Sequence, residues 1–175
     1  MGLRFKVMNR ADVLKFVHEF HDEPFYVISI HSSASFEPQF DMDNECLKDV
    51  LYMQFSDTDE QGYYDAITEE DGMKIYRWAK ELPDDALVVV HCRAGRSRSP
   101  AVVAALSYIF NGNDDEFWKC PPYTPNFLVY RFILYAWAKY ELFHMGYEKL
   151  QKNLDEFSRY RQGSHGNGIM KEEVS

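Results

Sequence analysis

The chain has 175 residues, of which 46% are hydrophobic, 27% charged and 16% aromatic. This length suits one domain with a sizeable core, and the composition excludes a disordered chain, a collagen-like chain and a small disulfide scaffold. The formal net charge of -9 argues against a general binder of nucleic acids or of anionic membranes, since both need a basic surface. We therefore expect any anionic ligand to be held by local charges rather than by the field of the whole protein.

Cysteine usage and hydropathy bear on the compartment. The cysteines are odd in number and sparse, which fits a reducing compartment better than a disulfide framework: Cys46, Cys92 and Cys120. Residues 1–10 lack the apolar core of a signal peptide, and the most apolar stretch, 127–143, contains basic residues and is shorter than the ~20 residues of a membrane span. The sequence therefore predicts a soluble cytoplasmic protein with no membrane-inserted segment. We expect one domain over 1–162 and a flexible tail over 163–175.

Hydrophobic periodicity predicts strands that alternate with helices. In chain order we expect a strand over 3–9, a helix around 13–20, strands over 25–30 and 50–55, a helix over 68–82, a strand over 86–91, and helices over 100–110, 126–143 and 147–157. Acidic or proline-rich loops are expected over 32–48, 56–68 and 114–125. This order predicts an α/β fold with a central, largely parallel sheet flanked by helices on both faces. Sites in such folds lie just beyond the carboxyl ends of the strands.

The residues after the strand over 86–91 are suited to holding an anion. This strand is apolar almost throughout, as a strand buried on both faces should be, and it leads directly to Cys92. A loop with a central glycine follows, and Pro100 suits the first turn of the next helix. Loop amides and a helix N-terminus favour an anion and lower the pKa of a nearby thiol, and Arg98 adds a planar fork of donors that matches phosphate. The pattern indicates phosphoryl transfer through a covalent cysteine intermediate.

The same residues carry a family resemblance. Cys92 to Arg98 reads C-x5-R, and His91 to Ser99 reads H-C-x-x-G-x-S-R-S. This segment resembles the signature loop of the cysteine-based protein phosphatases, closest to their dual-specificity branch. The resemblance covers about residues 25–143, because an acidic loop lies upstream of the motif and a Pro-Asn pair opens the helix downstream of it. It implies a cysteine-phosphatase fold of the dual-specificity type.

The resemblance also implies a role for each residue of the motif. Cys92 would attack phosphorus as a thiolate, and Ser99 would hydrogen-bond its sulfur and help it to leave. His91 would brace the loop and help to hold the thiolate form. Asp57 would act as general acid and then as general base. The phosphate would be bound by the loop residues Arg93, Ala94, Gly95, Arg96, Ser97 and Arg98. Neither a metal nor another cofactor is implied, and the partner would be a phosphorylated protein or another phosphate monoester.

Several assignments have alternatives. We favour Asp57 as the acid, with Asp59 as the nearest alternative and Asp65 as a distant third. Ser99 could instead cap the helix, which is compatible with catalysis. His91 could have a purely structural role, and we expect a structural role for Asn126.

The function has alternatives as well. Arg93 and Arg96 occupy positions at which tensin-type lipid phosphatases have lysines, which suggests a phosphoinositide phosphatase unless both side chains point outward. A catalytically silent phosphate-binding or interaction module is a rival of another class, and sulfur or arsenate transfer is a third. We expect no metal site at the His18 and His21 pair, and we expect Cys46 and Cys120 to be small buried residues. The preference for tyrosine, serine, threonine or lipid phosphates, and the oligomeric state, stay open.

Overall fold

The structure is a computed structural model that describes residues 2–33, 38–40 and 43–144. The chain divides into two compact units, residues 1–137 and residues 138–175. The first unit contains the sheet and the predicted phosphate-binding loop. The predicted final helix and tail lie outside the described residues, so the domain boundary at residue 162 stays a prediction.

The described elements follow the predicted order closely. The strands are β1 (Arg4–Asn9), β2 (Phe25–His31), β3 (Leu47–Gln54) and β4 (Leu87–Cys92). The helices are α1 (Arg10–His18), α2 (Glu69–Lys80), α3 (Arg98–Asn111), α4 (Asp115–Lys119) and α5 (Phe127–His144). The boundaries differ from expectation by a few residues, and one helix was not expected. Strand β3 begins three residues earlier than predicted and α3 two residues earlier, and the short helix α4 lies in a segment that was predicted to be a loop.

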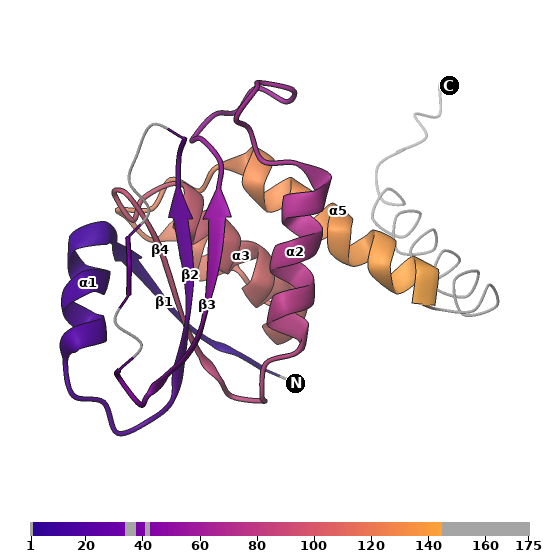
Figure 1. The fold of residues 1–175 in the computed structure, drawn as a ribbon. Helices are drawn as coiled ribbons and strands as arrows, with labels where there is room; N and C mark the ends of the chain where they lie inside the picture. Colours follow the sequence, from indigo (N-terminus) through magenta and orange to yellow (C-terminus); the bar gives the residue numbers. More distant parts are fainter. Residues whose placement is uncertain (1, 34–37, 41–42, 145–175) are drawn as a thin grey trace, which may run out of the picture. The chain divides into compact units, whose positions relative to one another are not determined.

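The four strands form one parallel sheet. Their order is β1-β4-β2-β3, so β4 lies inside the sheet between β1 and β2 (Figure 1). Helix α1 covers one face, while α2 and α3 pack on the other. This arrangement confirms the predicted α/β fold with a parallel sheet flanked by helices on both faces. It places the carboxyl end of β4 at the centre of the sheet, where neighbouring strands can enclose a site.

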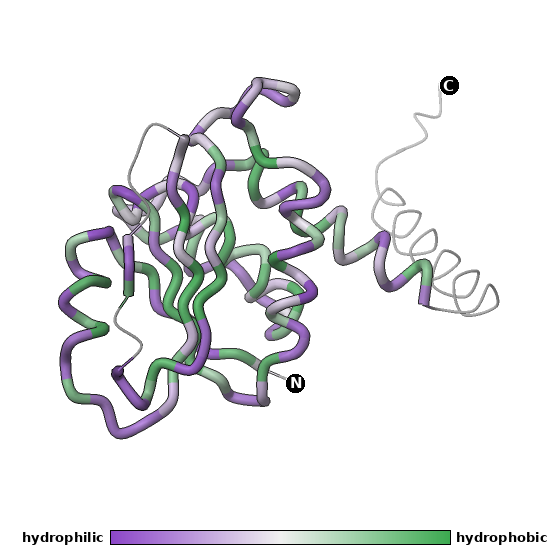
Figure 2. The backbone as a smooth tube through the Cα atoms, viewed as in Figure 1, coloured by the Kyte–Doolittle hydropathy of each residue, from purple (hydrophilic) through white to green (hydrophobic). Residues whose placement is uncertain are grey.

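Strand β4 is buried on both faces, as its continuous apolar sequence predicts (Figure 2). Because side chains alternate along a strand, Val88 and Val90 belong to the larger core beneath α2 and α3, and Val89 belongs to the smaller core beneath α1. The same alternation directs Cys92 towards the larger core and leaves His91 on the opposite face. The two residues of the motif therefore lie on opposite faces of one strand.

Helix α2 begins at a complete capping box. Thr68 and Asp71 bond each other's backbone N–H groups, which satisfies donors that the first turn leaves unpaired. The sequence predicted a helix start here from Thr68 and the glutamates that follow it, and the structure confirms this start. No helix in the described part of the chain is long and apolar enough to cross a membrane.

Gly72 allows α2 to approach α5 closely, which yields a first prediction. A Cβ atom at this position would lie 2.6 Å from the carbonyl oxygen of Phe132 and 2.9 Å from its carbonyl carbon. Alanine is favoured over glycine in a helix by roughly 1 kcal/mol, but overpacking costs about 1–3 kcal/mol, and the backbone of α5 cannot rotate away as a side chain can. We expect Gly72→Ala to lower the free energy of unfolding by about 1–2 kcal/mol, measured by urea denaturation.

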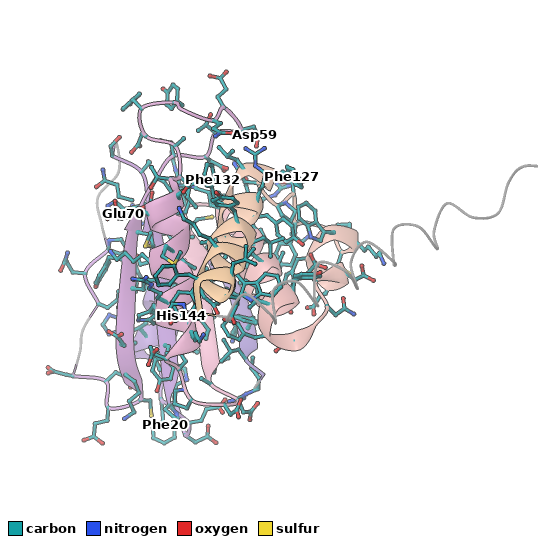
Figure 3. The ribbon with its side chains drawn as sticks, turned by 90° about the vertical axis from the view of Figure 1, so that its right-hand side faces the viewer. Phe20, Asp59, Glu70, Phe127, Phe132 and His144 are labelled. Carbon is teal, nitrogen blue, oxygen red and sulfur yellow. The ribbon has the colours of Figure 1, made fainter. Side chains whose placement is uncertain are left out.

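The matched control is Glu70→Ala, an exposed position on the same helix (Figure 3 labels Glu70 and Phe132). We expect this control to change stability by no more than about 0.5 kcal/mol, the usual range for a surface substitution. A Gly72→Ala protein as stable as the control would show that the two helices have room to separate.

Candidate active site

The predicted phosphate-binding loop joins β4 to α3 and is fixed to the end of β1. Gly95 has a φ of 67°, a left-handed conformation that glycine adopts without strain. A Cβ atom there would lie 2.8 Å from the backbone of both Met8 and Asn9, so a side chain has neither the conformation nor the space. The amide of Arg10 donates to the carbonyl oxygen of Arg93 at 3.3 Å. The central glycine of the motif is therefore required by the close approach of β1.

Cys92 is buried, with 2% of its surface exposed. Its Sγ lies 3.2 Å from Ser99 Oγ and accepts a hydrogen bond from the Gly95 amide at 3.3 Å. Burial raises the pKa of the thiol, but the hydrogen bonds from Ser99 and Gly95 and the charge of Arg98 outweigh it, so the pKa of Cys92 is lowered overall. Its surroundings thus favour the thiolate, the form that acts as a nucleophile.

The two serines of the loop have different partners. Ser97, rather than Ser99, is the N-cap residue of α3, and its side chain makes no capping hydrogen bond. Its hydroxyl instead donates to Asp57 Oδ1 at 2.6 Å. The alternative of Ser99 as a helix cap is therefore wrong, because Ser99 already lies inside the helix and faces the cysteine sulfur.

Arg98 is 6% exposed and is held by the residue that follows β3. Its Nη1 donates to the carbonyl oxygen of Phe55 at 2.8 Å. Its Nε has no hydrogen-bond partner among the described residues and lies 4.0 Å from Asp57 Oδ2. A buried guanidinium is rarely left with an unsatisfied donor, so this N–H group is available to an anion bound at the loop.

Asp57 stands between the loop and the start of α5. Its Oδ1 accepts from Ser97 and also from Asn126 Nδ2 at 3.0 Å, and 41% of the side chain is exposed. Asn126 also donates to the carbonyl oxygen of Thr58 and accepts from the amide of Val129, so it joins the acidic loop to α5. This geometry favours Asp57 over Asp59, because Asp57 is the carboxylate held beside Arg98 and Ser97.

Asp65 has a structural position at the far end of the same acidic loop. Its carboxylate accepts hydrogen bonds from the hydroxyls of Ser33 and Ser56 at 2.9 and 2.6 Å and from the amide of Ser33. Burial raises the pKa of Asp65, but these hydrogen bonds and the charge of Arg98 lower it by more than burial raises it. The pKa of Asp65 is therefore lowered overall. Its oxygens are occupied by these serine donors, and Asp65 is suited to anchoring the loop.

His91 is buried below the loop, on the opposite face of β4 from Cys92. Its Nε2 lies 2.9 Å from Ser29 Oγ, and the two residues are partners in the register of β2 and β4. Burial, with the nearby charges of Arg10 and Arg98, lowers the pKa of His91 to about 4. The imidazole is therefore neutral near pH 7 and acts through its hydrogen bond and packing. Sequence reasoning missed Ser29, although it is the one serine in the apolar run over 25–30.

The remaining predicted residues lie apart from this arrangement or at its edge. Arg93 and Arg96 are exposed, and Arg96 Nε donates to the carbonyl oxygen of Pro122 at 3.3 Å. His21 Nε2 is hydrogen-bonded to the Phe16 carbonyl oxygen, and within the described ranges no three His, Cys, Asp or Glu side chains gather in a way that could hold a metal ion.

The expectation that Cys120 is buried is wrong, because it lies exposed just beyond α4.

Comparisons with known proteins found likeness only among solved structures. No family model matches the chain, and no curated protein matches it. The crystal structure of Tk-PTP in the active form is similar with a TM-score of 0.49 and 19% identity, over 77% of this chain and 90% of that one. Human tyrosine phosphatase-like serine/threonine/tyrosine-interacting protein gives a TM-score of 0.46 and 19% identity, over 79% and 93% of the two chains. The chemistry of the site rests on its own geometry.

The sulfur environment yields a second prediction. Removing the Ser99 hydroxyl deletes a donor to Sγ while the thiol stays buried, so Ser99→Ala should raise the pKa of Cys92 and lower its thiolate fraction at neutral pH. The rate of alkylation by iodoacetate, measured against pH, should show its midpoint at higher pH in the variant than in the wild type.

Ser107→Ala provides the control for this experiment. Ser107 lies on the same helix, and its hydroxyl donates to the Asn113 carbonyl oxygen, away from the cysteine. We expect its alkylation profile to match that of the wild type. An unchanged midpoint in Ser99→Ala would mean that this hydroxyl does not stabilise the thiolate.

Proposed function

We propose that the protein is a phosphate-monoester hydrolase of the protein tyrosine or dual-specificity type, acting through a cysteinyl-phosphate. The observation that carries the proposal is the placement of a buried cysteine with a lowered pKa beside a buried arginine, at the carboxyl end of the inner strand β4. A thiolate and a fixed guanidinium in one anion-binding loop are the parts that nucleophilic attack on a phosphate needs. The likeness in fold to phosphatase structures is compatible with this proposal but does not carry it.

In the first step, the Cys92 thiolate attacks phosphorus. The S–P bond forms as the bond from phosphorus to the leaving oxygen breaks, and Asp57 gives its proton to that oxygen. Arg98 and the loop amides hold the equatorial phosphate oxygens, whose charge must be stabilised in the transition state. Arg98 Nε, which has no hydrogen-bond partner in the described part of the chain, supports this role.

In the second step, a water molecule attacks the phosphorus of the cysteinyl-phosphate. Asp57, now a carboxylate, takes a proton from this water, and the S–P bond breaks with its electron pair returning to sulfur. Ser99 stabilises the departing thiolate through its hydroxyl, 3.2 Å from Sγ. Neutral His91, held by Ser29, supports the strand end from the other face.

The substrate class that we favour is a phosphorylated protein. The phosphoinositide alternative requires Arg93 and Arg96 to face the ligand, but one donor of Arg96 is already directed to Pro122. The alternative of a catalytically silent phosphate-binding or interaction module is disfavoured. Such a protein would not need the cysteine, the arginine and the acid together, and this site has all three. The three free cysteines fit a reducing compartment, and we place the protein in the cytoplasm.

The mechanism predicts that replacing Asp57 and replacing Asp59 have different effects on kcat. Asp57→Asn should lower kcat by roughly 10²–10⁴ for a phosphopeptide, whose leaving group needs a proton, and by less for an activated aryl phosphate. Steady-state kinetics on both substrates would measure the difference. Asp59→Asn is the matched control and should keep the wild-type ratio of the two kcat values, that for the phosphopeptide and that for the aryl phosphate.

The same assay tests the function itself. The wild-type protein should hydrolyse the aryl phosphate and phosphotyrosine peptides, and it should hydrolyse phosphoinositides more slowly. Absence of hydrolysis for every phosphate ester would contradict the proposal. If Asp59→Asn shows the loss and Asp57→Asn does not, the general acid is misassigned by two residues.

A further inference from the structure

A cleft of about 620 Å³ opens beside the candidate active site, and it is lined partly by residues of that site and partly by residues outside it. It shares Asp57, Ser97 and Asn126 with the phosphate-binding arrangement. Beyond them it is bounded by Asp59 and by the aromatic residues Trp118 and Tyr123. We call this space the side cleft. A substrate whose phosphate lies in the loop would extend its neighbouring groups into it.

We propose that the side cleft binds a lysine or arginine side chain next to the phosphorylated residue of a peptide substrate, and so selects phosphosites with an adjacent basic residue. This inference rests on the proposed phosphatase function and adds a substrate class to it. It is carried by the combination of a carboxylate, an aromatic wall and a cleft of sufficient size at one edge of the site.

The charge of the side cleft favours a cation. Two carboxyl groups line it, and Asp59 takes no part in the proposed proton transfers. Arg98 lies 4.0 Å from Asp57, so the cation would be bound chiefly by Asp59, while Arg96 donates to Pro122 and Arg131 donates to Gln61. None of these arginines lines the cleft. The phosphate dianion of a bound substrate would add to the negative field, and the net charge of -9 acts in the same direction.

The aromatic wall is held in place by hydrogen bonds. Trp118 Nε1 donates to Asp114 at 2.9 Å, and Tyr130 OH donates to the same carboxylate oxygen at 2.8 Å. The Trp118 and Tyr130 rings meet edge to face at 5.1 Å, while 39% of Trp118 stays exposed. Tryptophan is the best aromatic partner for a cation, and a fixed ring loses little conformational entropy when it binds one.

The wall extends towards the acidic loop. Phe127 is 60% exposed and its ring lies 6.5 Å from that of Trp118. Figure 3 shows Phe127 and Asp59 at the same end of the molecule. A cation that binds against the aromatic wall would also be attracted by the Asp59 carboxylate. An acidic side chain or an additional phosphate at the same place would be repelled by that carboxylate. The volume lies within the roughly 300–1,000 Å³ of typical ligand sites, which leaves room for the peptide backbone as well as the side chain.

The test compares three phosphotyrosine peptides of equal length that differ only in the residue beside the phosphotyrosine: lysine, glutamine or glutamate. We expect kcat/KM to fall in that order, by about fivefold to tenfold from lysine to glutamine, the range of one exposed ion pair with a cation–π contact. The difference should appear in KM more than in kcat, and it should shrink as salt rises. Each value is divided by that for an activated aryl phosphate, which does not reach the side cleft.

Two variants assign the preference to the cleft. Asp59→Asn and Trp118→Leu should each reduce the preference for lysine over glutamine, with Asp59→Asn lowering it to about twofold or less because it removes the charge. Asp115→Asn is the matched control, since it removes the same charge from an exposed position of α4 outside the cleft lining. The control should keep the full preference, and an equal loss in the control would show that only the general field matters.

A binding measurement separates this inference from the proposed function. Affinities of the Cys92→Ser protein for the three peptides, measured by fluorescence anisotropy, should follow the same order whether or not the wild-type protein turns them over. Failure of the wild type to hydrolyse any phosphate ester refutes the phosphatase but leaves this order as the test of the cleft. Equal binding of the lysine and glutamate peptides, or stronger binding of a nucleotide monophosphate than of the lysine peptide, would overturn the inference.

Discussion

The proposed chemistry depends on favouring a thiolate in a buried position at the end of β4. Burial alone would raise the pKa of Cys92, because removing a charge from water is costly. The hydroxyl of Ser99, the amide of Gly95 and the guanidinium of Arg98 provide the opposing interactions, and together they shift the balance towards the charged form. Each of these groups belongs to the loop or the first turn of α3, so the chemistry requires this short segment to hold one conformation.

The rest of the fold supplies that conformation. On one side, the end of β1 lies so close to the loop that only glycine fits at position 95. On the other side, the Phe55 carbonyl oxygen holds Arg98, and Asp65 anchors the acidic loop to Ser33 and Ser56. The carboxyl ends of neighbouring strands meet at one edge of a parallel sheet, which is why segments far apart in sequence can act on the same loop.

Much of the fold and the position of the candidate site could be predicted from the sequence. The apolar run before Cys92 predicted an inner strand, which the structure confirms, whereas the anion binding expected of the loop from Cys92 to Arg98 stays a prediction. These signals are local, so no tertiary information was needed. The short helix α4 was missed because its position is stabilised by tertiary contacts: Asp114 receives hydrogen bonds from Trp118 and from Tyr130 on α5.

The choice between Asp57 and Asp59 is another feature that the sequence alone left open. Two acids separated by one residue look alike in sequence, and what distinguishes them is contact with Ser97 and Asn126, which lie 40 and 69 residues away. The same holds for Ser29, whose relation to His91 depends on the register between β2 and β4. Residues that orient a catalytic group from another strand or helix carry little local signal.

The central claim is that phosphate is transferred to the sulfur of Cys92, and trapping the intermediate tests it most directly. The Asp57→Asn protein should be mixed with an activated aryl phosphate, quenched in acid and measured by mass spectrometry, because loss of the base slows the second step and lets the adduct accumulate. The account predicts a single phosphoryl adduct on the peptide that contains Cys92, and none when Cys92 is also changed to serine. Turnover with no adduct, or an adduct on another residue, would contradict it.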